Sequence, residues 1–147
     1  MTRRDEVIAA LTETAKIDPE KFSPVTSNSR VNSFMYALAG WMYMLRRQKN
    51  TRIQAAASIG IMALAIWLGI DALGLAVLIL TITVVWMAEF INAAVEATIN
   101  LSTNELHPMA RVGKDVASAA VLLGVVASVL VGVLILGPPL VHKLGIG

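Results

Sequence analysis

The sequence predicts an all-α membrane protein with three transmembrane helices and an N-terminal amphipathic helix at the membrane surface. Of the 147 residues, 56% are hydrophobic and only 15% are charged, which is too apolar a composition for an ordinary soluble domain of this size. Three apolar runs, at about 53–70, 72–100 and 114–137, are each long enough to cross a hydrocarbon core of about 30 Å. A segment at about 29–50 precedes them and carries hydrophobic side chains at helical spacing.

The composition divides the chain into three regions. The regions that we expect are a cytosolic N-terminal extension at 1–28, a membrane domain at 29–141 and a C-terminal tail at 142–147. Within the surface helix, Phe34, Leu38 and Trp41 share one side, and a basic cluster follows them. This pattern is typical of a helix that lies in the membrane interface, either as a simple anchor or as part of a site.

Basic residues lie on one side of the predicted spans. Arg52 precedes the first span, and Arg111 and Lys114 precede or begin the third, whereas the connection between the first two spans contains only Asp71. By the positive-inside rule, the N-terminus is expected in the cytoplasm and the C-terminus outside. Cysteine is absent, which excludes a disulfide framework and thiol catalysis. The chain begins without the apolar core of a secretory signal, and we expect no nucleic-acid partner.

Polar side chains interrupt the apolar pattern of the second span. These side chains, which we call the polar stripe, are those of Glu89, Asn92, Glu96 and Asn100, and on a helix they fall within an arc of roughly 80°. A charge at the centre of a bilayer costs about 2.5–3.5 kcal/mol on insertion scales. We therefore expect the two carboxylates to lie near the membrane interface, to bind a cation or to be protonated. The plainer alternative is structural hydrogen bonding. The first span, with its small residues at 55–58 and 60, is expected only to pack against neighbouring helices.

The carboxylates and carboxamides of the second span, together with a lysine at its cytosolic edge, favour phosphoryl transfer. Oxygen ligands such as Glu96 and Asn92 suit Mg²⁺, which binds through one or two carboxylates plus substrate phosphates. Glu89 lies about 10 Å deeper by helical rise and could act as a general base on a hydroxyl group in the membrane. Lys114, at the cytosolic edge, suits phosphate oxygens. The G-x-x-x-x-G-K-[ST] loop of soluble nucleotide-binding enzymes does not occur.

Several of these residues also have plainer explanations. Lys114 could serve only as a topology signal, and Asp115 could merely pair with Arg111 at the i, i+4 spacing. Glu105 could be a helix cap, and His107 could be a surface imidazole. From the residues alone, these alternatives stay open.

A set of motifs occurs together in this chain. They are Glu89-Phe-Ile-Asn92-Ala-Ala-Val-Glu96, Glu105-Leu-His107-Pro108, Lys114-Asp115-Val-Ala-Ser118-Ala-Ala-Val, and upstream Ser33-Phe34-Met-Tyr36-Ala37-Leu-Ala-Gly40 and Asn50-Thr-Arg52-Ile53. Over roughly residues 29–140 the chain resembles the prokaryotic integral-membrane diacylglycerol kinases and their undecaprenol kinase relatives. The resemblance implies a homotrimer in the bacterial inner (cytoplasmic) membrane, with ATP as co-substrate, Mg²⁺ as cofactor, a membrane lipid as acceptor and active sites where the membrane meets the cytosol.

The resemblance also implies roles for individual residues. Glu89 and Asn92 match catalytic positions, Glu89 being the base for the lipid hydroxyl, and Glu89 and Ser118 match positions that contact the lipid. Glu96 and Gln48 match metal positions. The nucleotide positions are matched by Arg30, Tyr36, Glu105, His107, Lys114 and Asp115. The chain departs from the pattern at Gln48, where many members have a glutamate, and at Asn100, where many have an aspartate. Each departure removes a negative charge near the implied metal and phosphate site.

The function predicted from this reasoning is an ATP- and Mg²⁺-dependent kinase that phosphorylates the hydroxyl of diacylglycerol. Undecaprenol is the alternative acceptor. A small proton- or cation-coupled transporter is an alternative of another class, since an intramembrane glutamate could cycle its proton, and a catalytically silent membrane scaffold is a third.

Overall fold

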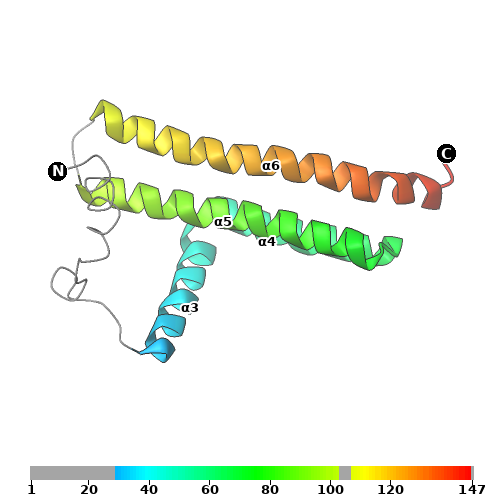
Figure 1. Ribbon diagram of the computed structural model, residues 1–147, viewed down its shortest axis with the longest axis horizontal. Coiled ribbons are helices and arrows are strands. Elements are labelled where there is room, and N and C mark those ends of the chain that lie inside the picture. The colour runs from blue at the N-terminus through cyan, green and yellow to red at the C-terminus, as the bar shows by residue number, and fades with distance from the viewer. Residues whose placement is uncertain (1–28, 103–106, 147) are drawn as a thin grey trace, which may run out of the picture. The chain divides into compact units, whose positions relative to one another are not determined.

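The computed structural model describes residues 29–102 and 107–146 (Figure 1). These ranges contain the helices α3 (Arg30–Arg47), α4 (Lys49–Leu68), α5 (Ala72–Ser102) and α6 (Pro108–Lys143). The chain divides within α3 into two compact units, residues 1–41 and 42–147, and each is described by itself. The predicted N-terminal extension at 1–28 lies outside the described residues, as does Glu105.

Three of these helices are long and apolar enough to cross a membrane. They are α4, α5 and α6, with 20, 31 and 36 residues, and they confirm the predicted all-α membrane protein with three spanning helices. At a rise of 1.5 Å per residue, α5 extends about 46 Å and α6 about 54 Å, whereas the hydrocarbon core is about 30 Å thick. Both helices therefore extend beyond the hydrocarbon core.

The segment predicted as a surface helix at about 29–50 is helical from Arg30 to Arg47. In the first unit its large hydrophobic side chains are all exposed, including Phe34, Tyr36 and Trp41. In the second unit its last turns contain one buried side chain, that of Met44. A helix with so many exposed apolar side chains suits the membrane interface, and its placement there stays a prediction.

A tight turn reverses the chain between α4 and α5. Gly69 has a φ of 73°, a left-handed conformation that favours glycine because it has no Cβ. In this turn the N–H of Gly69 donates to Ile66 O and that of Ile70 to Ala65 O. Asp71 then caps α5, because its Oδ1 accepts a hydrogen bond of 2.8 Å from the N–H of Gly74. The two helices are thus fixed as antiparallel neighbours.

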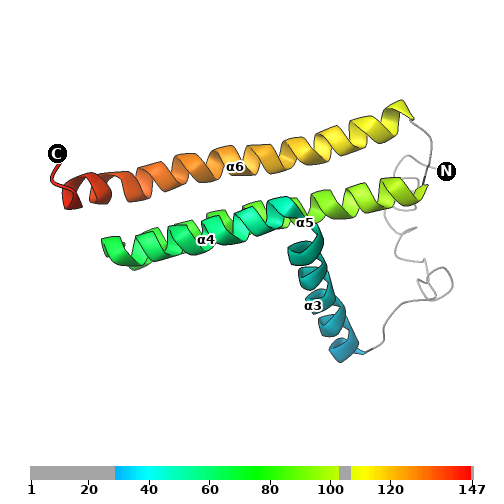
Figure 2. The same cartoon turned by 180° about the vertical axis from the view of Figure 1, so that it is seen from behind.

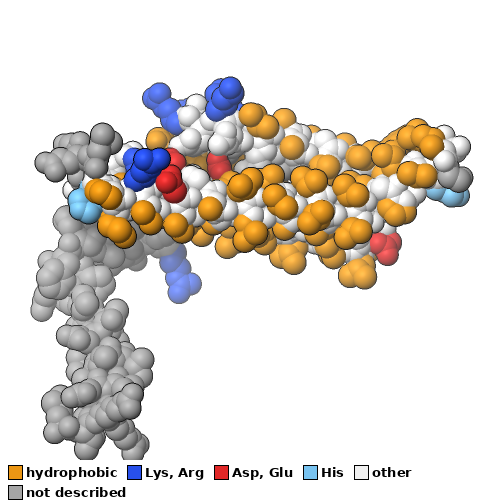
Figure 3. Space-filling model, turned by 90° about the horizontal axis from the view of Figure 1, so that it is seen from above, with side chains coloured by type: hydrophobic (Ala, Val, Ile, Leu, Met, Phe, Trp, Pro, Cys, Tyr) orange, Lys and Arg blue, Asp and Glu red, His pale blue; other side chains and the backbone are white. Residues whose placement is uncertain are grey.

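The spanning helices pack along a narrow seam. Figures 1 and 2 show α4, α5 and α6 side by side, and each contributes one residue to a buried cluster: Ala65, Leu78 and Leu136. Most other large hydrophobic side chains of these helices are exposed. Figure 3 shows one face of them, covered by hydrophobic side chains, with most of the visible charged side chains toward one end. A surface of this kind suits contact with lipid or with other membrane helices.

The last helix continues past Gly137, where the sequence predicts the end of the third span. Pro138 and Pro139 lie inside α6, which runs on to Lys143, although each proline lacks the N–H that would bond the preceding turn. Contacts of Lys143 stabilise this last turn. Its ammonium group donates to the carbonyl oxygen of Trp67 and lies 4.3 Å from the centroid of the indole ring, so the end of α6 is tied to the end of α4.

Replacing Lys143 with methionine is therefore expected to loosen the end of α6. A cation over an aromatic ring is worth about 0.5–1 kcal/mol at an exposed site, so the amides of Leu144 and Gly145 should exchange with solvent a few-fold faster. Hydrogen exchange of the detergent-solubilised protein, read by mass spectrometry, measures this change. Lys143→Arg keeps the cation and serves as the control; equal exchange in the two variants would contradict the role given to the charge.

Candidate functional site

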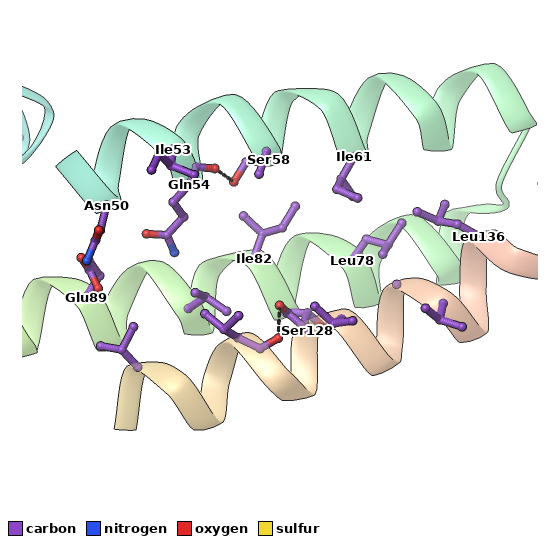
Figure 4. Close-up of a pocket in the computed structure, with 18 of the residues that line it drawn as sticks. Asn50, Ile53, Gln54, Ser58, Ile61, Leu78, Ile82, Glu89, Ser128 and Leu136 are labelled. Carbon is purple, nitrogen blue, oxygen red and sulfur yellow. Dashed lines mark hydrogen bonds between the residues drawn. The ribbon is translucent and has the colours of Figure 1, made fainter. Parts of the chain in front are cut away.

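The most deeply buried acidic side chain in the described residues is that of Glu89, at 5% exposure. It lies on α5, about 26 Å by helical rise from Ala72, the first residue of that helix. If the hydrocarbon core begins near Ala72, Glu89 lies just inside its other edge. The side chain of Asn50, at the start of α4, is turned toward this carboxylate (Figure 4). The buried carboxylate therefore has a polar neighbour on the adjacent helix.

The other members of the α5 stripe lie nearer the end of the helix and contact one another or α6. Asn92 Nδ2 donates to Glu96 Oε1 at 3.4 Å, and Asn92 Oδ1 accepts from Ser118 Oγ at 3.5 Å. Further along, Lys114 Nζ donates to Asn100 Oδ1 at 2.6 Å. The structure thus brings Asn92 and Asn100 of α5 into contact with Ser118 and Lys114 of α6.

The partner of Lys114 is a neutral amide. No carboxylate forms an ion pair with Lys114 among residues 29–102 and 107–146, so its positive charge is not neutralised by a neighbouring side chain there. A close approach of the two helices positions it: a Cβ on Gly113 would lie 2.9 Å from Ile99 Cδ1. An ammonium group that is held in place and uncompensated can bind an anion such as phosphate.

His107 and Asp115 lie on the surface at the start of α6. His107 is the N-cap of that helix, and its Nδ1 accepts a hydrogen bond of 3.2 Å from Met109 N. Pro108 begins the helix, a position that suits proline because the first N–H groups of a helix have no partner within it. Asp115 pairs with Arg111 at 3.7 Å, with both side chains largely exposed. These contacts correspond to the plainer explanations of the two residues, and a role in nucleotide binding stays a prediction.

The remaining predicted site residues are more scattered. Gln48 lies between α3 and α4, is half-buried and precedes the first residue of α4 in an extended conformation. Arg30 and Tyr36 are exposed residues of α3 in the first unit, which is described by itself. Glu105 lies outside the described residues.

A groove of about 700 Å³ runs along α4, α5 and α6, and Glu89 is part of its lining. Most of the other lining residues are aliphatic, among them Ile61, Leu78 and Leu136 (Figure 4). Asn50 and Glu89 lie at one end of the portion drawn, and Leu136 lies toward the other. The groove therefore combines a long apolar surface with one carboxylate near its end.

Sequence reasoning missed the polar side of α4, since it expected the first span only to pack. Asn50, Gln54 and Ser58 all line the groove, and Ser58 Oγ accepts a hydrogen bond of 3.1 Å from Trp86 Nε1 on α5. The signal was present, because the i, i+4, i+8 spacing of these three residues places them on one face of the helix. The small residues around them are typical of close helix packing, which was the prediction for this span.

The acidic side chains of residues 29–102 and 107–146 do not form a closed metal site. In the described part of the chain no group of three or more His, Cys, Asp or Glu side chains could hold a metal ion. The half-buried Glu96 carboxylate and the Asn92 amide nevertheless supply oxygen ligands of the kind that Mg²⁺ uses. They fit a metal that arrives with phosphate oxygens rather than one held by protein side chains alone.

Comparison with known proteins identifies similar chains. A family model described as prokaryotic diacylglycerol kinase matches residues 35–136. A diacylglycerol kinase of Synechocystis sp. is 38% identical over 109 residues, which are 74% of this chain and 62% of that protein. An undecaprenol kinase of Bacillus subtilis is 30% identical over 113 residues, 77% of this chain and 92% of that protein. A diacylglycerol kinase of Escherichia coli is 34% identical over 67 residues, 46% of this chain and 55% of that protein. The matched region thus spans less than two thirds of the Synechocystis and Escherichia coli proteins.

Proposed function

The chain belongs to the prokaryotic diacylglycerol kinase family, a family of lipid kinases, and from this premise we propose that it transfers the γ-phosphoryl group of ATP to the hydroxyl of diacylglycerol. The products are phosphatidic acid and ADP. The observation that carries the proposal is the burial of Glu89 in the lining of an apolar groove, near the calculated edge of the hydrocarbon core. A lipid alcohol has the same combination of a long apolar chain and one reactive hydroxyl.

In this mechanism, Glu89 is the general base. Its carboxylate takes the proton of the acceptor hydroxyl as the hydroxyl oxygen forms a bond to the γ-phosphorus, and the bond from that phosphorus to the bridging oxygen of ADP breaks. The near-complete burial of Glu89 keeps bulk water away from the carboxylate, which favours transfer to the lipid over hydrolysis of ATP. Asn50 and Asn92 orient the groups around it.

Lys114 supplies positive charge for the phosphate oxygens. Asn100 holds its ammonium group without neutralising it, so attraction to the phosphates is retained as charge develops in the transition state. Ser118 lies beside Asn92, where it would contact the acceptor. Arg30, Tyr36, Glu105, His107 and Asp115 complete the proposed nucleotide site.

Glu96 would hold Mg²⁺ together with the phosphates of ATP, and Gln48 would add a neutral ligand. When bound, the metal neutralises phosphate charge and orients the phosphoryl group for in-line transfer. The chain's own contribution is the half-buried Glu96 carboxylate, which Asn92 orients by donating to one oxygen. Since Gln48 and Asn100 carry no charge, we expect the site to depend strongly on Glu96 for its negative charge.

Undecaprenol is the second candidate acceptor. The observation in its favour is the similarity to the Bacillus subtilis undecaprenol kinase, of whose length 92% is matched. Membership of a kinase family speaks against a coupled transporter and a silent scaffold.

We further propose a homotrimer in the bacterial inner membrane with the N-terminus in the cytoplasm, supported by the exposed apolar helices and by the basic residues before α4.

The function is tested with purified protein, radiolabelled MgATP, and diacylglycerol and undecaprenol offered side by side. Wild-type protein is expected to label diacylglycerol. Glu89→Gln should lower kcat by about 10²–10⁴-fold, the usual contribution of a general base, while the protein keeps its helical circular dichroism spectrum. A folded Glu89→Gln variant with near-normal kcat would disprove the assignment of the base, and labelling of undecaprenol alone would identify the second acceptor.

Glu96 is tested by titrating Mg²⁺ at fixed ATP. Loss of the carboxylate in Glu96→Gln should raise the Mg²⁺ concentration for half-maximal activity by tenfold or more, since a charged oxygen ligand is replaced by a neutral one. Thr98→Ala is the matched control, because the Thr98 hydroxyl on the same part of α5 only donates to Ala94 O. An unchanged Mg²⁺ dependence in Glu96→Gln would rule out the metal role.

A further inference from the structure

We propose that Trp86 and Ser58 are positioning residues: the hydrogen bond between their side chains sets the rotation of α4 against α5 and so keeps Asn50 turned toward the Glu89 carboxylate. This inference rests on the proposed lipid kinase function and adds to it two side chains that lie outside the polar stripe. It begins from one contact between the helices, in which Trp86 Nε1 donates to Ser58 Oγ at 3.1 Å.

The hydroxyl of Ser58 is held by a second hydrogen bond. It donates to the backbone carbonyl of Gln54 on the same helix at 2.7 Å (Figure 4). Since a serine hydroxyl has a single proton, the bond from Trp86 falls on a lone pair of Oγ. Hydrogen bonds weaken steeply when they are misaligned, and an indole has only two side-chain torsions with which to follow its partner. The bond therefore restricts both rotation and sliding of α4 along α5.

The bond lies deep in the membrane-spanning part of the structure. Trp86 is about 21 Å by helical rise from Ala72, the first residue of α5, which is inside a hydrocarbon core of about 30 Å that begins near Ala72. Both Trp86 and Ser58 are half-buried. A hydrogen bond between membrane helices favours the bonded arrangement by about three- to fifteenfold, so its loss should measurably change the position of α4.

The bond shares its helix faces with the proposed base. On α4, Asn50 lies two turns before Ser58 on one face. On α5, Glu89 follows Trp86 by one turn on the same side of the helix. Figure 4 shows Asn50 and Ser58 along α4, with Glu89 opposite Asn50. A rotation of α4 that separates Ser58 from Trp86 would therefore also turn Asn50 away from Glu89.

The end of α4 at Leu68 is held by other contacts. The turn at Gly69 joins it to α5, and Trp67 is bound by Lys143 of α6. Ser58 lies about 15 Å from Leu68 by helical rise, toward the start of the helix. The bond to Trp86 thus acts on the half of α4 that carries Asn50, which the turn and Lys143 restrain least.

The kinetic test removes the bond from either side. Trp86→Phe lacks the donor and Ser58→Ala lacks the acceptor, and each is expected to lower kcat with diacylglycerol by about three- to fifteenfold. The KM for MgATP should not change, because Glu96 and Lys114 lie on α5 and α6. The double variant should lose no more than either single one, since both changes remove the same interaction. Ser58→Thr keeps the hydroxyl and should retain the wild-type kcat.

Thr83→Val is the matched control. The Thr83 hydroxyl lies on the same part of α5 but donates to Ile79 O of its own helix at 2.8 Å, so its loss should leave kcat unchanged. An Asn50→Ala background separates positioning from general stability, because Ser58→Ala should cause no further loss there. Wild-type kcat in both single variants, multiplied losses in the double variant, or an undiminished loss in the Asn50→Ala background would overturn the inference.

A second measurement needs no turnover. In ¹⁵N NMR spectra of the protein without ATP, the Trp86 indole signal should shift in Ser58→Ala as the bond is lost. The side-chain amide signals of Asn50 should shift in the same variant and stay in place in Thr83→Val. Asn50 signals that stay in place while the indole signal moves would contradict the inference. If the wild-type protein phosphorylates none of the lipids, the proposed function fails, whereas these spectra still decide whether the bond positions Asn50.

Discussion

The burial of a carboxylate on a helix long and apolar enough to span a membrane is the constraint on which the polar part of this structure depends. Within a bilayer, α-helices satisfy their own backbone hydrogen bonds, so α4, α5 and α6 need little else to form. A buried carboxylate cannot be satisfied by hydrogen bonds within its own helix backbone. The free-energy cost of burying its charge must be reduced by polar neighbours or by a bound ligand. Asn50 lies beside Glu89 and reduces that cost. Amide and hydroxyl contacts continue the polar network further along α5 and α6.

The residues of the polar stripe lie in two chemical environments along one helix, one buried and one more exposed. Glu89 is almost fully buried, whereas Glu96 is half-buried and Asn100 is exposed. Helical rise places Glu96 about 10 Å further along the axis, beyond the calculated edge of the hydrocarbon core. A single continuous helix can therefore present one carboxylate to a lipid group and another to water-soluble phosphates. Because α5 is one continuous helix, helical geometry sets the spacing between these two environments.

The neutral residues of the site also matter for its electrostatics. Lys114 is held by the Asn100 amide at 2.6 Å, and a carboxylate at that position would pair with the ammonium group and compete with phosphate for it. With Gln48 and Asn100 both uncharged, fewer negative charges surround the proposed phosphate site. In the proposed mechanism, this arrangement would favour the approach of ATP and would place more of the binding of Mg²⁺ on Glu96.

The sequence by itself determined the fold class, the three spanning helices and the polar stripe of α5, because these depend on local hydropathy and helical period. It also indicated the relation to lipid kinases. Only the tertiary structure decided that Lys114 is held by Asn100, that Ser118 meets Asn92, and that α6 continues through Pro138 and Pro139 to reach Trp67. Such contacts depend on the rotation of one helix against another, which periodicity does not specify. For the same reason, the polar face of α4 at Asn50, Gln54 and Ser58 was visible as a spacing but became part of a site only when it faced Glu89 across a shared groove.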